Sequence, residues 1–210
     1  MDKFLYWFVK LSGLPVEWCY YKRKVYYYNE SQKRVIKGGA LIVSNHRAIM
    51  DFPFYMYTFK RSVIRPVTGD IIYRKGKLLT WFLNRMGAIR VSEGSYDFDF
   101  INKSEKIINK GGKVLIFPEA RVSNKVPYEM YEFKPSFVSI ALNTNCPIIP
   151  CFTDGKYGKK GSKVIIGEKL YLRDMYDETK SEKENLEKLS KFVRDYIKML
   201  GEKLSEKEKE

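Results

Sequence analysis

The chain has 210 residues, of which 44% are hydrophobic and 15% aromatic, a composition that excludes a largely disordered protein. Its formal net charge of +14 favours anionic partners such as phospholipid headgroups, acidic carrier proteins, phosphorylated cofactors or nucleic acid, without choosing among them. Acidic and basic side chains nearly balance in residues 177–210, so the excess positive charge lies in the first 176 residues.

Cysteine and histidine content argues against a disulfide framework and against zinc. The three cysteines, Cys19, Cys146 and Cys151, contain no Cys-x-x-Cys pair, which fits reduced thiols in a cytoplasm. His46 is the only histidine, so no metal site is expected.

The first 28 residues are aromatic and basic. Residues 1–14 show no small-residue cleavage site and no charge-free run of the ~20 residues that span a bilayer, so we expect neither secretion nor a membrane span. Apolar residues recur at helical spacing and break near Gly13 and Pro15, which predicts two short amphipathic helices. Their apolar side either covers the core or contacts a membrane. Residues 20–28 either begin a strand or lie at an interface.

From residue 37 onward, apolar runs alternate with helical patterns. Strands are predicted at residues 40–43, 63–67, 88–91, 114–117 and 148–152, with one or two more in 163–172. Helices are predicted at residues 51–59, 77–86, 98–109, 136–143 and 182–200. The alternation indicates an α/β fold, with a mostly parallel or mixed central sheet flanked by helices and functional groups in loops at strand ends.

The predicted domain organisation has three parts. Residues 1–36 form an N-terminal amphipathic segment that associates with membranes, and residues 37–200 form a single catalytic domain. Residues 201–210 are mostly Glu and Lys, and we expect this charged tail to fray into solvent.

A histidine and an aspartate follow the first strand of this domain. His46 lies five residues before Asp51, across a predicted strand-to-helix turn. An imidazole can take a proton from an alcohol at neutral pH, and a carboxylate on its other nitrogen fixes the tautomer. The pair is therefore predicted to be a general base and the group that orients it.

Further blocks follow in order along the chain. They are Met-Gly-Ala-Ile-Arg-Val at residues 86–91, Leu-Ile-Phe-Pro-Glu-Ala-Arg at 115–121, Phe-Lys-Pro-Ser at 133–136 and Cys-Pro-Ile-Ile-Pro at 146–150. Together with Leu-Ile-Val-Ser-Asn-His at residues 41–46, they resemble the PlsC-like family of lysophosphatidic acid acyltransferases over roughly residues 38–152. Compared with the family, Glu93 stands where an arginine is common, and Ala120 replaces a glycine.

The resemblance implies site residues. His46 and Asp51 would be catalytic, with Asn45, Arg90, Glu119, Arg121 and Pro150 as substrate-binding residues. Arg121 is the first candidate for an acceptor phosphate and Arg90 the second, because a guanidinium forks onto phosphate oxygens. Pro150 would help to shape an apolar wall for the acyl chain.

The resemblance also implies an activity. The chain would move a fatty acyl group from acyl-CoA or acyl-carrier protein to the free hydroxyl of a lysophospholipid, most simply 1-acylglycerol-3-phosphate, with no metal or bound cofactor. It would act peripherally on membrane lipids at the cytoplasmic face of the cell membrane. Covalent thiol catalysis is disfavoured, since it needs a base and the single histidine belongs to another motif.

The alternative from another functional class is a nucleic-acid-binding module. The net charge and the tyrosines beside Lys22, Arg23 and Lys24 favour it, because bases stack on aromatic rings in basic grooves. It leaves the ordered blocks unexplained, so nucleic acid is not the expected partner.

Overall fold

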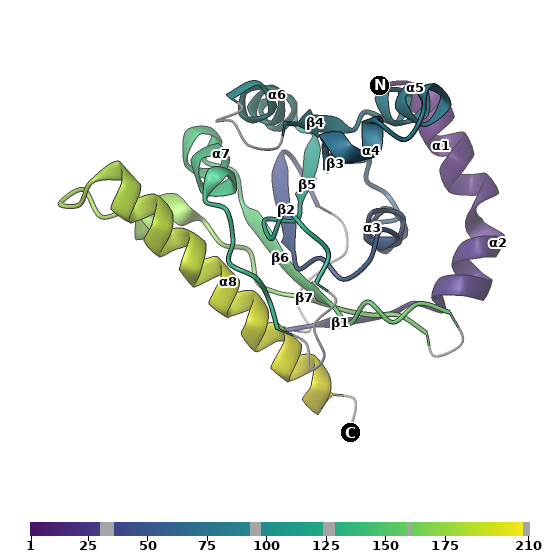
Figure 1. The fold of residues 1–210 in the computed structure, drawn as a ribbon. Coiled ribbons are helices and arrows are strands. Elements are labelled where there is room, and N and C mark those ends of the chain that lie inside the picture. The colour runs from purple at the N-terminus through teal and green to yellow at the C-terminus, as the bar shows by residue number, and fades with distance from the viewer. Residues whose placement is uncertain (30–35, 93–97, 124–128, 159–160, 208–210) are drawn as a thin grey trace.

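A computed structural model describes residues 1–29, 36–92, 98–123, 129–158 and 161–207. Its centre is a seven-stranded sheet in the order β1-β7-β6-β2-β5-β3-β4 (Figure 1). The strands are β1 (Lys24–Tyr27), β2 (Ala40–Ser44), β3 (Ile64–Gly69), β4 (Ile89–Val91), β5 (Lys113–Ile116), β6 (Ile148–Thr153) and β7 (Lys163–Ile166). Neighbouring strands are parallel except β6 and β7, so the predicted mixed, mostly parallel sheet is confirmed.

Helices cover both faces of the sheet. The α-helices are α1 (Lys3–Ser12), α2 (Leu14–Val16), α3 (Asp51–Thr58), α4 (Asp70–Tyr73), α5 (Lys77–Met86), α6 (Phe98–Asn109), α7 (Ser136–Thr144) and α8 (Glu182–Glu206). A π-helix, η1 (Glu17–Tyr21), and a 3₁₀-helix, η2 (Leu172–Met175), complete the described elements. In Figure 1, α6, α7 and α8 lie on one side of the sheet, and α1, α2 and α3 lie on the other.

The central strand β2 shows why both faces must be covered. Leu41 and Val43 pack with α7 and α8 residues, whereas Ala40 and Ile42 pack with α3 and the N-terminal segment. All four side chains are fully buried, which explains the continuous apolar run in the sequence.

The N-terminal segment is built into the domain. β1 pairs with β7 from Lys24 to Tyr27, so the open choice for residues 20–28 is resolved as a strand at the sheet edge. Tyr21 is almost fully buried and packs with the core. Residues 1–29 therefore pack as part of the same fold as the strands and helices that follow.

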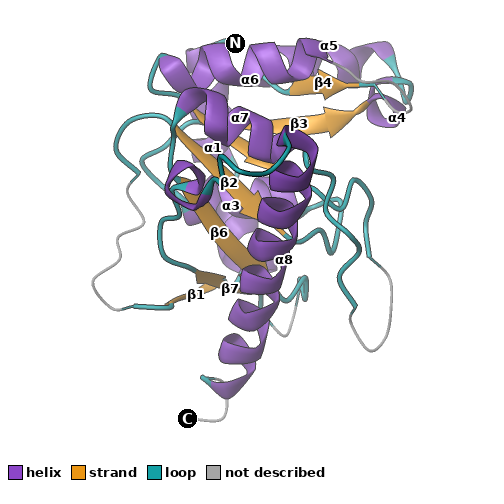
Figure 2. Cartoon of the chain, turned by 90° about the vertical axis from the view of Figure 1, so that its left-hand side faces the viewer, coloured by secondary structure: helices purple, strands orange, loops and turns teal. Residues whose placement is uncertain are grey.

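The expected fraying of the C-terminal tail is wrong for residues 201–206. Helix α8 continues to Glu206 because its apolar stripe continues, with Leu200 and Leu204 four residues apart and both buried. Gly201 lies so close to the Phe152 ring that a Cβ there would meet it at 2.7 Å. Figure 2 shows α8 extending beyond the sheet toward the C-terminus.

The other helices and strands predicted from residue 40 to residue 152 are confirmed with ends shifted by at most two residues, and residues 163–172 hold one strand, β7. The helices α4 and η2 were not predicted. Within the described ranges, no helix combines the length and apolarity that crossing a membrane requires. The parallel strands β2 and β5 are neighbours in the sheet, so the segments that follow them, at residues 45–50 and 117–123, leave the same edge.

Candidate active site

His46 and Asp51 meet at the turn between β2 and α3. The His46 Nδ1 lies 2.8 Å from Asp51 Oδ2, and the His46 side chain remains 20% exposed while that of Asp51 is fully buried. A carboxylate only accepts here, so Nδ1 carries the hydrogen and the lone pair is on Nε2. The structure thus brings the predicted pair together, with the accepting nitrogen on the edge of the ring away from Asp51.

The buried carboxylate of Asp51 is compensated by several donors. Besides His46, its Oδ2 accepts the backbone N–H groups of Arg47 at 2.7 Å and Ala48 at 3.0 Å. Its Oδ1 accepts the hydroxyl of Tyr157. Asp51 is also the first residue of α3, where the partial positive charge of the helix favours an anion.

Tyr157 is a site residue that the sequence did not indicate. It lies in the connection between β6 and β7, 106 residues from Asp51, and its ring packs edge-on against Tyr21. Burial and the neighbouring Asp51 raise the pKa of the Tyr157 hydroxyl far above its ordinary value, so it remains a hydrogen-bond donor. No local pattern in the sequence marks it, because it approaches Asp51 only through the fold.

The block at residues 115–121, with the loop that follows it, holds the backbone of His46. Glu119 is buried, and its Oε1 accepts the His46 N–H at 2.8 Å, while Oε2 accepts the Tyr131 N–H at 2.8 Å. The Ser123 N–H donates to the His46 carbonyl at 2.9 Å. The Phe117 ring stacks on the imidazole with centroids 4.4 Å apart. Glu119 lies beside His46 as expected, but both oxygens bind backbone amides, which favours a positioning role over contact with substrate.

The block also contains a strained residue. Ala120 has φ +56°, in the left-handed region that glycine occupies at little cost. The replacement noted in the sequence therefore has a conformational cost at the turn that carries Glu119.

The two candidate arginines lie in different surroundings. The exposed guanidinium of Arg121 lies over the Tyr131 ring, 3.8 Å from its centroid, beside the loop that holds His46. Arg90 forms an ion pair with Asp70 and lies over the Tyr73 ring at 5.2 Å. Glu93, which stands at the usual arginine position, lies outside the described residues.

Asn45 and Pro150 do not have the surroundings expected of substrate ligands. Asn45 is fully buried, and its amide clamps the backbone of Thr153 through bonds of 2.9 and 2.8 Å, which joins the ends of β2 and β6. Pro150 is buried in β6 beside Gly167, on the side of the sheet that faces Leu200 of α8. Both side chains are buried in contacts within the sheet and its helices, so they have no surface left for a substrate.

The cysteines fit inert thiols. Cys146 and Cys151 are buried, and burial raises the pKa of both. No cluster of three or more metal-ligating side chains occurs in the part of the chain that the structure describes. Chemically, the arrangement offers one base, the His46 Nε2, with an oriented imidazole and a buried carboxylate behind it.

Comparisons with known proteins identify the fold and the family. The structure is similar to that of the 1-acyl-sn-glycerophosphate (LPA) acyltransferase PlsC from Thermotoga maritima, with a TM-score of 0.69 and 19% sequence identity over 97% of this chain and 80% of that one. A comparison with curated proteins found no match. The acyltransferase family profile matches residues 23–154, which span β1 to the end of β6 and include His46, Asp51 and Glu119. The chain belongs to the acyltransferase family.

Proposed function

We propose that this acyltransferase moves a fatty acyl group from a thioester to the free hydroxyl of a lysophospholipid, with 1-acylglycerol-3-phosphate as the first candidate. The observation that carries the proposal is the His46 imidazole, which donates through Nδ1 to Asp51 and keeps Nε2 for the acceptor hydroxyl. The fold shared with an enzyme described as an LPA acyltransferase supports the choice of acceptor.

In the proposed reaction, the His46 Nε2 takes the hydroxyl proton as the acceptor oxygen attacks the thioester carbonyl. The carbon–sulfur bond breaks, and the imidazolium returns its proton to the departing thiolate. Asp51 holds the ring and stabilises the imidazolium. The acceptor is itself the nucleophile, so no acyl-enzyme, metal or bound cofactor takes part, and acyl-CoA or acyl-carrier protein serves as donor.

Helix α1 supports action at a membrane surface, because its apolar side faces outward. Phe4, Phe8 and Leu11 are 81%, 58% and 61% exposed. The inward side is polar at its tips: the Tyr6 hydroxyl accepts the Ile64 N–H, and the Lys10 Nζ donates to two backbone carbonyls of residues 59 and 62. Exposed apolar side chains in this arrangement are stabilised when they leave water and contact the acyl chains of a bilayer. We infer a peripheral enzyme at the cytoplasmic face of the membrane, where thioester donors are found.

The nucleic-acid alternative loses part of its support. Tyr21, in the middle of the basic-aromatic stretch, is a core residue with 1% exposure. Arg23 is paired with Glu17 at 2.7 Å, and both side chains are largely buried. Neither is available to stack on or bind a nucleotide.

The proposal is tested by assaying the purified chain with several lysolipids and with both acyl-CoA and acyl-carrier protein as donors. Folded His46→Ala should lose roughly 10²–10⁴-fold in rate, the usual contribution of a general base. Wild-type activity in that variant would falsify the mechanism. Inactivity of the unmodified chain on every acceptor would reject the proposed function itself.

A further inference from the structure

The corner formed by α4 and α5 has an apolar outer side that the core does not use. Leu78 and Trp81 are 79% and 50% exposed, and Ile71 of α4 is 59% exposed. Leu78, Trp81 and Arg85 are three and four residues apart, so they share one side of α5. Met86, which points in another direction from the same helix, is 1% exposed. This helix therefore presents a large apolar surface outward.

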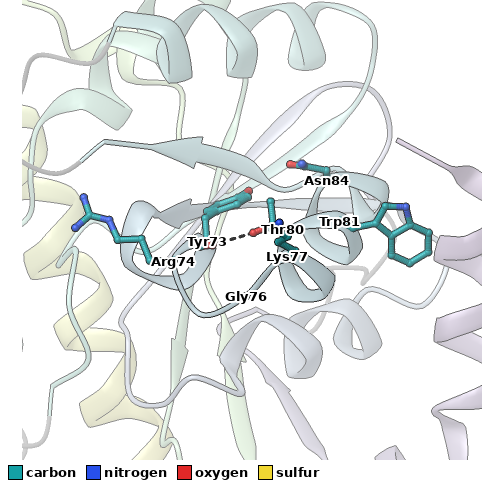
Figure 3. Close-up of a pocket in the computed structure, with 7 residues that line it drawn as sticks. All are labelled: Tyr73, Arg74, Gly76, Lys77, Thr80, Trp81 and Asn84. Carbon is teal, nitrogen blue, oxygen red and sulfur yellow. Dashed lines mark hydrogen bonds between the residues drawn. The ribbon is translucent and has the colours of Figure 1, made fainter.

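A cavity of about 470 Å³ lies beside this apolar surface, lined by residues of α4, α5 and the turn between them. Its lining includes the cations Arg74 and Lys77, the polar side chains of Thr80 and Asn84, and Trp81. Figure 3 shows Arg74 and Trp81 on opposite sides of it.

Tyr73 adds an unused donor to the same cavity. Its side chain is 7% exposed, and its hydroxyl has no hydrogen-bond partner among the described residues. In Figure 3 the tip of the Tyr73 ring points toward Asn84, across the cavity. A buried hydroxyl without a partner costs free energy, which an oxygen acceptor that reached it would offset.

The α5 surface continues onto the exposed side of α1. The Arg85 guanidinium lies 5.5 Å from the centre of the Trp81 ring and forms a 3.1 Å ion pair with Asp2, which caps α1. The Asp2 N–H also donates to the Arg85 carbonyl at 2.8 Å. The C-terminal end of α5 thus meets the N-terminal end of α1, and Phe4 follows Asp2 by two residues.

The charges here select an anionic partner. Within the described ranges, no carboxylate forms an ion pair with Arg74, Lys75 or Lys77, and the whole chain carries +14. Tryptophan and basic residues next to exposed leucine are the combination favoured where headgroups meet acyl chains.

We propose that the α4–α5 corner is a second membrane contact, in which Leu78 and Trp81 enter an anionic bilayer while Arg74 and Lys77 bind phospholipid headgroup phosphates. The proposal rests on the proposed action at a membrane surface and goes beyond it by assigning a contact outside the N-terminal segment. A contact that spans two helices fixes the orientation of the domain on the bilayer, which a single amphipathic helix does not.

Tryptophan fluorescence tests the contact directly. The chain has three tryptophans, so the full-length double variant Trp7→Phe/Trp18→Phe retains Trp81 alone. With phosphatidylglycerol vesicles whose acyl chains carry bromine, Trp81 emission should shift to the blue and be quenched. If this variant sediments with the vesicles while Trp81 emission is unchanged, the proposal is overturned.

Vesicle sedimentation of the full chain separates the contributing groups. Leu78→Ala/Trp81→Ala should bind phosphatidylglycerol vesicles roughly tenfold more weakly, because large apolar side chains no longer leave water. The matched control is Met175→Ala/Phe192→Ala, since both residues are exposed apolar side chains outside α1, α4 and α5, and its binding should not change. Equal losses in the two double variants would overturn the assignment.

The source of the phosphate and the link to activity are tested separately. Lys77→Ala should weaken binding about fivefold on phosphatidylglycerol vesicles and not on phosphatidylcholine vesicles. Millimolar inorganic phosphate should not reverse binding; full reversal would indicate a free-anion site and overturn the proposal. Turnover of a short soluble acceptor should be unchanged in Leu78→Ala/Trp81→Ala. If the unmodified chain proves inactive, the proposed function fails while the fluorescence and sedimentation results still decide the membrane contact.

Discussion

The backbone N–H of His46 donates to the Glu119 carboxylate at 2.8 Å, so Glu119 binds the main chain of the base-bearing turn and not its imidazole. The other Glu119 oxygen accepts the Tyr131 N–H. This single carboxylate therefore links the base-bearing turn to the loop on which Arg121 lies.

Glu119→Gln should impair positioning. An amide presents one acceptor where two N–H groups need one each, so a buried donor is left unsatisfied at a cost of about 1–3 kcal/mol. We expect kcat to fall roughly 10–100-fold with little change in the acceptor KM, because a displaced base slows chemistry more than binding. Kinetics and urea unfolding measure both effects, and exposed Glu132→Gln is the control. A raised KM with unchanged kcat would instead assign Glu119 to substrate binding.

Tyr157→Phe removes one donor from Asp51 while keeping the ring that packs on Tyr21. The less compensated carboxylate should hold the His46 imidazolium more strongly, so the acidic limb of the pH–rate profile moves to higher pH. The rate at neutral pH should fall by up to roughly tenfold, the scale of one hydrogen bond to a charged group. Tyr20→Phe keeps the neighbouring stacked ring and serves as control. An unshifted pH–rate profile would mean that Tyr157 contributes to packing and not to the electrostatics of the site.

Arg121→Gln should raise the KM for a phosphorylated lysolipid roughly tenfold or more, the scale of a lost charge-assisted hydrogen bond, and leave a neutral acceptor nearly unaffected. Arg121 is exposed beside the His46 loop, whereas Arg90 is neutralised by Asp70, so Arg90→Gln is the matched comparison. Steady-state kinetics on the two acceptors decide the matter. Equal losses on both would mean that Arg121 acts through its stacking on Tyr131.

Ala120→Gly should stabilise the fold by about 0.5–1 kcal/mol. The substitution removes the strain of a positive φ from the folded state, and this gain exceeds the free-energy cost of the more flexible unfolded chain. The matched change Ala88→Gly, where φ is not positive, should destabilise by a similar amount. The free energy of unfolding in urea measures both. Destabilisation by both substitutions would show that the turn at residue 120 is not strained.

Lys10 predicts a pH dependence of stability. Burial, with a smaller contribution from nearby Arg23, lowers the pKa of Lys10 to about 8. Between pH 8 and about 10.4 the unfolded chain then binds more protons at this residue than the folded chain, so Lys10 adds stability as the pH rises through this window. The unfolding free energy of the wild type minus that of Lys10→Met should increase by roughly 1–3 kcal/mol from pH 7 to 10.5. Parallel profiles would contradict the expected burial of the charge.

The amino-acid sequence by itself determined the order of strands and helices, the α/β class and the His46–Asp51 pair. These depend on local information: apolar periodicity reports which side of an element is buried, and five residues across one turn are enough to bring an imidazole to a carboxylate. The block at residues 115–121 likewise marked Glu119 as a residue of the same site. Its role was not readable, since a motif does not say whether a carboxylate faces substrate or backbone.

Only the tertiary structure decided which polar groups remain available. Asn45 is bound to Thr153 and Arg90 to Asp70, partners that lie 108 and 20 residues away along the chain, and Tyr157 reaches Asp51 across 106 residues. The same applies to α1, where helical spacing predicted an amphipathic helix but not that its apolar side faces outward. Periodicity fixes which residues share one side of a helix, whereas the direction of that side depends on what the rest of the chain places against it.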